Sequence, residues 1–244
     1  MAMRTIFTWI NLRLGLMLAL VIFLFSFTSI RNEGRKLKGS AVFFVEENSF
    51  FIKQESVNKL LIENKTQASA IKKVTLDLNK LEKSIDHNPM IEKSEVYVSI
   101  DGILTAKVEQ KTPIARVFDA SSSYYIDYHG RKMPLSEEFT ARVPVVSGIT
   151  TPKSLQQVVP VLQYIFKDSF LKKNIIGVEL VPVTGLRMLN RNFEYEIEFG
   201  NPIRIDSKFC CYKAFFQKAV LDSSLIKYKR INLKFKNQVV CIKK

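Results

Sequence analysis

The stretch NPMIEKSEVYVSIDGILTAKVEQKTPIARV, residues 88–117, holds two runs of alternating apolar and polar residues that meet at Asp101-Gly102. This alternation is typical of strands that bury one face. An Asp-Gly pair between two such strands favours a two-residue hairpin turn of type I′, in which both central residues have positive φ. Pro89 ends the preceding helix, and Pro113 limits backbone pairing afterwards. The stretch therefore predicts a β-hairpin within a small mixed α/β binding module.

The alternation also assigns one face of each strand to the core. Successive side chains of a strand point to opposite faces, so the inward residues recur at every second position. The residues expected to point inward are Val96, Val98 and Ile100 in the first strand and Leu104, Ala106 and Val108 in the second.

The N-terminal region contains a charge-free run, LGLMLALVIFLFSFTSI, at residues 14–30 between Arg13 and Arg31. With Trp9 and Ile10 upstream, the run reaches the roughly 20 residues that a helix needs to cross a bilayer. The alternative is a cleaved signal peptide, whose apolar core has about 7–15 residues and ends at a small-x-small site. No Ala-x-Ala follows this longer run, so the sequence favours an uncleaved membrane anchor.

Charge alone leaves the orientation of this anchor open. Arg4 and Arg13 precede the apolar run, whereas Arg31 and three further basic residues within 35–38 follow it. A plain positive-inside count would keep the larger C-terminal part in the cytoplasm. The rule weakens for long translocated segments, so the count does not decide the orientation.

Composition is typical of a globular chain with room for one large or two small domains. The 244 residues are 47% hydrophobic and 25% charged, with a net charge of +14. The basic residues are mostly single and spread along the chain, without an RNP1-like or zinc-finger spacing, which disfavours nucleic acid as a partner. Three cysteines are too few for a disulfide framework. A bond from Cys210 or Cys211 to Cys241 stays open for a chain outside the cytoplasm.

The segment before the hairpin predicts one strand and two helices. The apolar positions of the first helix follow i, i+3, i+4 spacing, and Asp77 is a suitable N-cap for the second. The predicted order is β-α-α-β-β, with a strand at 41–45, helices at 54–64 and 77–87, and the hairpin.

The remainder of the chain is rich in strands. Thr151-Pro152 is a helix start, and Pro160 is expected to kink or break that helix. Asp206 is expected to cap a second helix to about Leu221, with Phe209, Phe216 and Val220 facing inward. Asn237 is either a turn between the last two strands or a bulge in one long strand. The expected strands are 114–118, 124–128, 131–135, 143–147, 175–180, 186–189, 193–199, 203–205, 230–235 and 238–242.

In this order of elements the chain resembles the FtsQ/DivIB family of bacterial cell-division proteins. The resemblance covers nearly the whole chain and rests on ordered structural patterns, none of them decisive alone. Asn232 stands where an acidic residue is common, and Phe235 where Tyr is common. The matching segments include NPMI at 88–91, VYV at 96–98, DGIL at 101–104, VEQKTP at 108–113, ARV at 115–117, YID at 125–127, VPVVSG at 143–148 and RINLKF at 230–235.

The resemblance implies an α+β fold in three parts. An N-terminal transmembrane helix precedes a POTRA-like (polypeptide-transport-associated) β-α-α-β-β domain and then a mixed β-sheet domain with two helices. The implied division is a cytoplasmic tail and transmembrane helix at 1–31, a linker at 32–40, the POTRA-like domain at 41–111 and the β domain at 112–244.

The resemblance also implies a function. Members of the family are non-catalytic scaffolds that link early division proteins to FtsB/FtsL-type partners and septal wall synthesis. The expected location is the bacterial inner membrane at the division site, with the N-terminus in the cytoplasm and the bulk in the periplasm. No catalytic residue, cofactor, metal, nucleic acid or small-molecule substrate is expected.

A partner strand is expected to add to the terminal strand, using backbone groups for affinity and alternate side chains for specificity. The alternative is a central strand whose apolar residues are core. A second candidate surface lies around Ile52, Val57 and Tyr97, against the alternative of ordinary core and surface. The residues proposed for the terminal edge are Lys234, Phe235, Asn237, Val239 and Cys241.

The alternative function is a membrane-tethered extracytoplasmic enzyme or a POTRA protein of an export pathway. Asp127 beside Tyr128 and His129 is compatible with acid–base chemistry, although a turn accounts for the Asp equally well. The chain lacks the G-x-S-x-G, H-E-x-x-H, Walker A and G-x-G-x-x-G motifs. A convergence of Asp127, His129 and a third polar group in a pocket would favour the enzyme.

Overall fold

The computed structural model contains two compact units. It describes residues 9–46, 51–62, 71, 73, 76–119, 122–148, 151–236 and 238–244. The first unit takes in the N-terminal helix and residues up to Glu109, and the second takes in Gln110–Lys244 together with the short segment Asn48–Phe51. Each unit has a hydrophobic core of its own.

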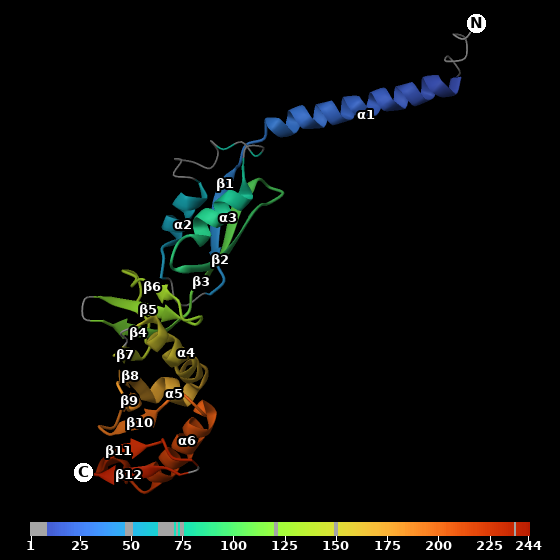
Figure 1. The fold of residues 1–244 in the computed structure, drawn as a ribbon. Coiled ribbons are helices and arrows are strands. Elements are labelled where there is room, and N and C mark those ends of the chain that lie inside the picture. Colours follow the sequence, from blue (N-terminus) through green and yellow to red (C-terminus); the bar gives the residue numbers. More distant parts are fainter. Residues whose placement is uncertain are drawn as a thin grey trace. The chain divides into compact units, whose positions relative to one another are not determined.

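The first helix, α1 (Trp9–Glu33), carries the charge-free run (Figure 1). Its segment Asn11–Asn32 has 22 residues with a mean hydropathy of 2.1, and none of it is buried against the rest of the chain. At 1.5 Å per residue it is about 33 Å long, enough to cross the hydrocarbon layer of a bilayer.

In the remainder of the first unit, two helices pack on one face of a three-stranded sheet. The strand order is β1 (Gly39–Phe44), β3 (Ile103–Gln110), β2 (Ile91–Val98), and β1 runs parallel to β3. The helices are α2 (Gln54–Leu61) and α3 (Leu78–Asp86). The Asp77 side chain accepts a hydrogen bond from the Lys80 N–H, which confirms the predicted N-cap. The shared core includes Val42, Val57, Leu61, Leu81, Ile85, Val96, Leu104, Ala106 and Val108.

The hairpin is present, but its turn differs from the expected type I′. The Gly102 N–H donates to the Ser99 carbonyl oxygen (3.0 Å) and the Ser99 N–H donates to the Ile103 carbonyl oxygen (2.9 Å), so the loop has three residues, 100–102, instead of two. Gly102 has φ +86°, whereas Asp101 does not have positive φ. The longer turn moves Ile100 out of the strand, so it does not continue the inward row and is fully exposed.

The basic segment after α1, expected to be a linker, is bonded into the first unit. The Leu37 side chain is buried in the core. The Leu37 N–H donates to the Ile71 carbonyl oxygen, and the Arg35 carbonyl oxygen accepts from the Lys73 N–H at 3.0 Å. The folded unit therefore begins within two residues of the end of α1.

The second unit is a nine-stranded mixed sheet with helices on one face (Figure 1). Two of the three parallel strand pairs in this sheet are joined by helical crossovers. Helices α4 (Pro152–Lys167) and α5 (Ser169–Asn174) connect β7 to β8, and α6 (Ile205–Leu221) connects β10 to β11. The strand order is β12 (Val240–Lys243), β11 (Tyr228–Asn232), β10 (Glu196–Gly200), β9 (Gly185–Asn190), β8 (Ile175–Val181), β7 (Val145–Ser147), β4 (Pro113–Phe118), β5 (Ser123–Asp127) and β6 (Lys132–Met133).

The predicted α+β class is confirmed, while several local predictions for the second unit are wrong. The strand expected at 203–205 is absent, because Arg204 takes the left-handed conformation (φ 53°) as N-cap of α6. Asp206 therefore lies in the first turn of α6, and Val220 is exposed. Helix α4 runs through Pro160 without breaking. Helix α5 was not predicted, and Asn237 lies outside the described residues.

Candidate partner-binding edge

Strand β12 is the terminal strand and lies at one edge of the nine-stranded sheet. It pairs with β11 in an antiparallel register that runs from Asn232↔Val240 to Tyr228↔Lys243. Within the described part of the chain, no strand pairs with its other side. An edge strand presents a row of unpaired backbone N–H and C=O groups to which another chain can bind. Among the described strands, β12 is thus an edge strand and not the central strand of the alternative.

The side chains of residues 239–242, in and just before β12, alternate between the core and the opposite face of the sheet. Cys241 pairs with the buried Ile231, and Cys241 and Val239 pack against the core. Val240 and Ile242 lie on the other face, where their side chains are 38% and 47% exposed. Val240 and Ile242 are absent from the predicted set, which contains Val239 and Cys241 from the buried face instead. The signal that identifies the outward pair is the buried Ile231 directly opposite Cys241.

The other residues predicted for the edge lie in the connection before β12. Lys234 forms an ion pair with Glu198, with 3.3 Å between Nζ and Oε2, and its N–H donates to Asn232 Oδ1. Phe235 is half exposed. Asn237 lies outside the described residues. Of the predicted residues, Lys234 thus makes polar contacts, Phe235 has a half-exposed ring, and Val239 and Cys241 pack against the core.

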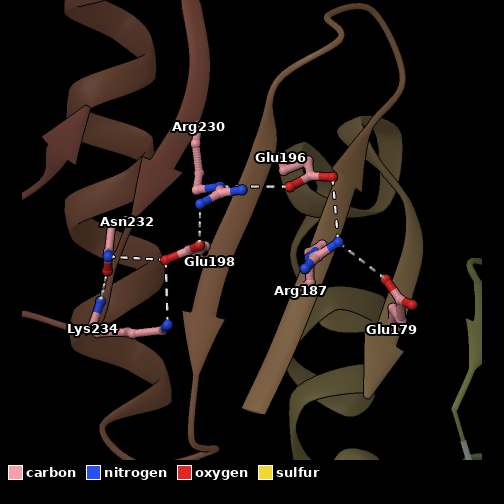
Figure 2. Close-up of polar contacts among 7 residues, drawn as sticks. All are labelled: Glu179, Arg187, Glu196, Glu198, Arg230, Asn232 and Lys234. Atoms are coloured by element: carbon pink, nitrogen blue, oxygen red, sulfur yellow. Dashed lines mark hydrogen bonds and ion pairs between the residues drawn. The ribbon is translucent and has the colours of Figure 1, made fainter. Parts of the chain in front are cut away.

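A row of alternating charges crosses the outer face of strands β8 to β11 and ends beside β12 (Figure 2). Arg187 lies between Glu179 (3.8 Å) and Glu196 (3.4 Å). Arg230 lies between Glu196 (3.6 Å) and Glu198 (3.1 Å). We call these residues, together with Lys234, the charge ladder: Glu179, Arg187, Glu196, Arg230, Glu198 and Lys234.

The charge ladder reaches the edge through Arg230, whose register partner on β12 is Ile242. A single exposed ion pair contributes about 0–1 kcal/mol to stability, whereas the charges of the ladder form a network that joins β8, β9, β10 and β11. Arg230 lies directly beside Ile242, and Asn232, which donates to the ladder residue Glu198, lies beside Val240. A chain added at this edge would meet an apolar strip bordered by fixed charges of both signs.

The turn after β10 is held by a buried lysine. Lys208 of α6 donates from Nζ to the carbonyl oxygens of Phe199 and Asn201, both at 2.7 Å. Burial lowers the pKa of Lys208 to about 8, and the positive charges of Arg204 and Lys234 add to the shift. The lysine therefore fixes the turn that carries the chain from β10, the neighbour of β11, into α6.

Gly200 at this turn allows Lys234 to approach closely. Its φ is +72°, and a Cβ atom built on it would lie 2.8 Å from Lys234 Cγ. A side chain at position 200 would displace Lys234, which pairs with Glu198. The absence of a side chain at Gly200 thus lets the turn after β10 pack against Lys234, in the segment that precedes β12.

Asp127 has a structural role in the turn after β5. Its Oδ1 accepts from the backbone N–H groups of His129 (2.9 Å) and Arg131 (2.8 Å), and its Oδ2 accepts from Arg131 Nε at 2.7 Å. The carboxylate is 1% exposed in this arrangement. The structural role in a turn, which was the alternative to acid–base chemistry, therefore accounts for a buried Asp at position 127.

Ile52 and Val57, proposed for a second docking surface, are core residues of the first unit. Their exposed fractions are 8% and 0%, so neither can contact a partner directly. Tyr97 is half exposed on β2. The surface as proposed is wrong, because the helical spacing of Val57 reflects packing against the sheet.

A family model described as FtsQ/DivIB, C-terminal related, matches residues 112–242, more than half of the chain. The chain belongs to the FtsQ/DivIB family. This confirms the family predicted from the sequence, and FtsQ/DivIB membership implies a role in cell division. Together with α1, it indicates a membrane-anchored cell-division protein.

Two individual proteins from the same family are also similar to this chain. The cell division protein FtsQ of Salinibacter ruber is 25% identical over 159 residues. That match covers 58% of this chain and 60% of the relative, so this chain spans about three fifths of the relative's length. The major extracytoplasmic domain of the cell division protein DivIB from Geobacillus stearothermophilus matches 46% of this chain and 95% of that domain, with 14% identity and a TM-score of 0.30.

Proposed function

We propose that this protein is a non-catalytic, membrane-anchored scaffold of the bacterial division machinery. In this proposal β12 receives a strand from an FtsB/FtsL-type partner and so links early division proteins to septal wall synthesis. Family membership supports the division role. The observation that carries the docking proposal is the position of β12 at the edge of the nine-stranded sheet.

The edge supplies both parts of strand recognition. Backbone groups on the unpaired side of β12 bind the partner's backbone, which gives affinity without a sequence requirement. Val240, Ile242 and Phe235 offer partly exposed apolar side chains, and the ladder residue Arg230 lies beside Ile242. The partner strand is therefore expected to combine apolar residues on one face with charges that complement the ladder.

The proposal places the N-terminus in the cytoplasm, the bulk of the chain in the periplasm and the protein at the division site. It also assigns residues 41–111 to a POTRA-like domain and 112–244 to the family's β domain, after a tail and anchor at 1–31 and a connecting segment at 32–40. The β-α-α-β-β order of the first unit supports the POTRA-like assignment.

Exposed residues at the edge give a direct test of docking. Ile242→Lys and Phe235→Lys place an ammonium where the partner's apolar residues would pack, so we expect each to reduce co-purification of FtsB/FtsL homologues at least about tenfold. Val220→Lys on α6 is the matched control, because Val220 is 46% exposed and Ile242 is 47% exposed. Unchanged co-purification with both edge variants would refute docking at β12.

Orientation is tested separately. A reporter enzyme that is active only outside the cytoplasm, fused after Lys244, is expected to be active. A stable but inactive fusion would contradict the proposed topology and leave the docking proposal untouched.

A further inference from the structure

The β2–β3 turn exposes an isoleucine completely. Ile100 has a relative exposure of 104%, so it makes no contribution to the core of its own unit. The turn around it is well formed, because the Ser99 N–H donates to the Ile103 carbonyl oxygen at 2.9 Å and the Ile103 N–H donates to Ser99 Oγ at 3.1 Å. A hydrogen-bonded turn therefore presents an apolar side chain, whose transfer from water to apolar surroundings is favourable.

Basic residues flank this turn. The Lys38 N–H donates to the Gly102 carbonyl oxygen at 2.8 Å. A Cβ atom built on Gly102 would lie 3.6 Å from Lys38 Cγ and 3.9 Å from the Lys36 carbonyl oxygen. The backbone of the basic segment and the backbone of the turn are thus in contact.

The same basic segment leads directly from the membrane helix. The apolar span of α1 ends at Asn32, and Lys36 follows four residues later. Four extended residues cover at most about 14 Å, so the turn beside Lys36 stays near the end of the span whatever the direction of α1. The headgroup layer of a bilayer lies within this reach.

Within the described part of the chain, no ion pair neutralises the positive charge of this segment. Among the described residues, none of the four cations in this segment takes part in an ion pair, and all four residues are exposed. Two of them, Arg31 and Arg35, line a surface hollow together with Phe25, Thr28, Ser29 and Asn32. The four cations are Arg31, Arg35, Lys36 and Lys38, against a single acidic residue in the segment, Glu33.

We propose that this end of the first unit rests on the bilayer surface as a second membrane contact. Ile100 enters the interfacial layer, and Arg35, Lys36 and Lys38 bind the headgroups of anionic phospholipids. An apolar side chain beside a basic cluster is the chemistry that recognises an anionic lipid surface. The inference rests on the proposed anchoring by α1 and is independent of docking at β12.

The test uses the full chain with its single tryptophan moved to the turn. The variant carries Trp9→Phe and Ile100→Trp and is reconstituted into vesicles of phosphatidylcholine alone or mixed with phosphatidylglycerol. The matched control carries Trp9→Phe and Val183→Trp, because Val183 lies in the β8–β9 turn of the second unit and is also 104% exposed. Emission wavelength and quenching by phospholipids with brominated acyl chains are measured for both.

We expect the tryptophan at position 100 to emit at shorter wavelength and to be quenched at least about twofold more than the one at position 183 in vesicles that contain phosphatidylglycerol. Equal emission and quenching at the two positions would overturn the proposal. Flotation with the vesicles separates the two failures: a chain that floats but is not quenched refutes only the second contact, whereas a chain that does not float refutes the anchor.

The role of charge is tested in the same system. Lys36→Glu combined with Lys38→Glu, added to the variant with tryptophan at position 100, is expected to remove the dependence of quenching on phosphatidylglycerol. Unchanged dependence would overturn headgroup binding by these lysines. Lys218→Glu combined with Lys229→Glu, at two exposed positions of the second unit, gives the same change in net charge and is the control.

Discussion

At the scale of single residues, Lys208 is the least expected feature of the second unit. A buried ammonium is unfavourable unless hydrogen bonds replace its hydration. Here Nζ donates to two carbonyl oxygens, and the Phe199 ring lies 4.5 Å away. The sequence offered no signal for this role, because the lysine is one of many and its partners are backbone atoms.

Lys208→Met should therefore destabilise the second unit by about 1–2 kcal/mol, because two carbonyl oxygens lose their donor. Thermal unfolding of the full chain in detergent, followed by circular dichroism, measures the effect. Lys218→Met on the same helix is the control, since Lys218 is exposed. Equal stability of the two variants would show that the hydrogen bonds of Lys208 do not stabilise the turn.

The lowered pKa of Lys208 predicts a pH dependence. The folded chain releases this proton near pH 8, whereas the unfolded chain keeps it to about 10.5. Between these values the unfolded state binds more protons, so the contribution of Lys208 to stability rises with pH. The difference in unfolding free energy between the parent chain and Lys208→Met should therefore be larger at about pH 10 than at about pH 7. An advantage that does not grow with pH would contradict the shift.

At the scale of elements, the turn between β10 and α6 depends on Gly200. Gly200→Ala adds a Cβ atom at φ +72° and 2.8 Å from Lys234 Cγ. We expect a loss of about 1–2 kcal/mol in the second unit, since a non-glycine residue is strained there and Lys234 must move. Gly39→Ala in β1 is the control, because a Cβ atom there meets nothing within 4 Å. Similar unfolding temperatures for the two variants would refute the close packing at the turn.

Elements with strong local signals were predicted well from the sequence. The Asp77 cap, the apolar spacing of α2 and the alternation in β2 and β3 each express a local preference that the fold keeps. Elements whose conformation depends on contacts distant in the sequence were not predicted well. The sequence Ile203-Arg204-Ile205 favours a strand, but the left-handed Arg204 starts α6 instead.

The candidate edge shows the same division. The sequence located the terminal strand but not its register, and a shift of one residue exchanges its two faces. Only the pairing of Ile231 with Cys241 shows that Val240 and Ile242 face outward.

Helix α5 was missed because it has only six residues, too few for an apolar spacing to stand out. Its start is fixed by Asp168, whose side chain accepts hydrogen bonds from the N–H groups of Phe170 and Leu171.

At the scale of the whole molecule, the two separate cores predict two unfolding events. Leu104 lies in the core of the first unit and Ile197 in that of the second, both fully buried. Leu104→Ala and Ile197→Ala should each cost about 2–5 kcal/mol, confined to the unit that contains the change. Pulse proteolysis of the full chain, with fragments identified by mass spectrometry, measures each unit. Loss of both units together in either variant would show that they unfold as one.

The parallel pairing of β1 with β3 determines how the first unit bears a mechanical load. The chain enters β1 from α1 at Gly39, beside Ile103 at the start of β3, and it leaves β3 at the far end toward the second unit. Tension between the anchor and the second unit therefore pulls the two strands lengthwise past each other. Force applied in this direction is shared by the whole ladder from Gly39↔Ile103 to Phe44↔Val108, and the strands shear apart together instead of unzipping one bond at a time.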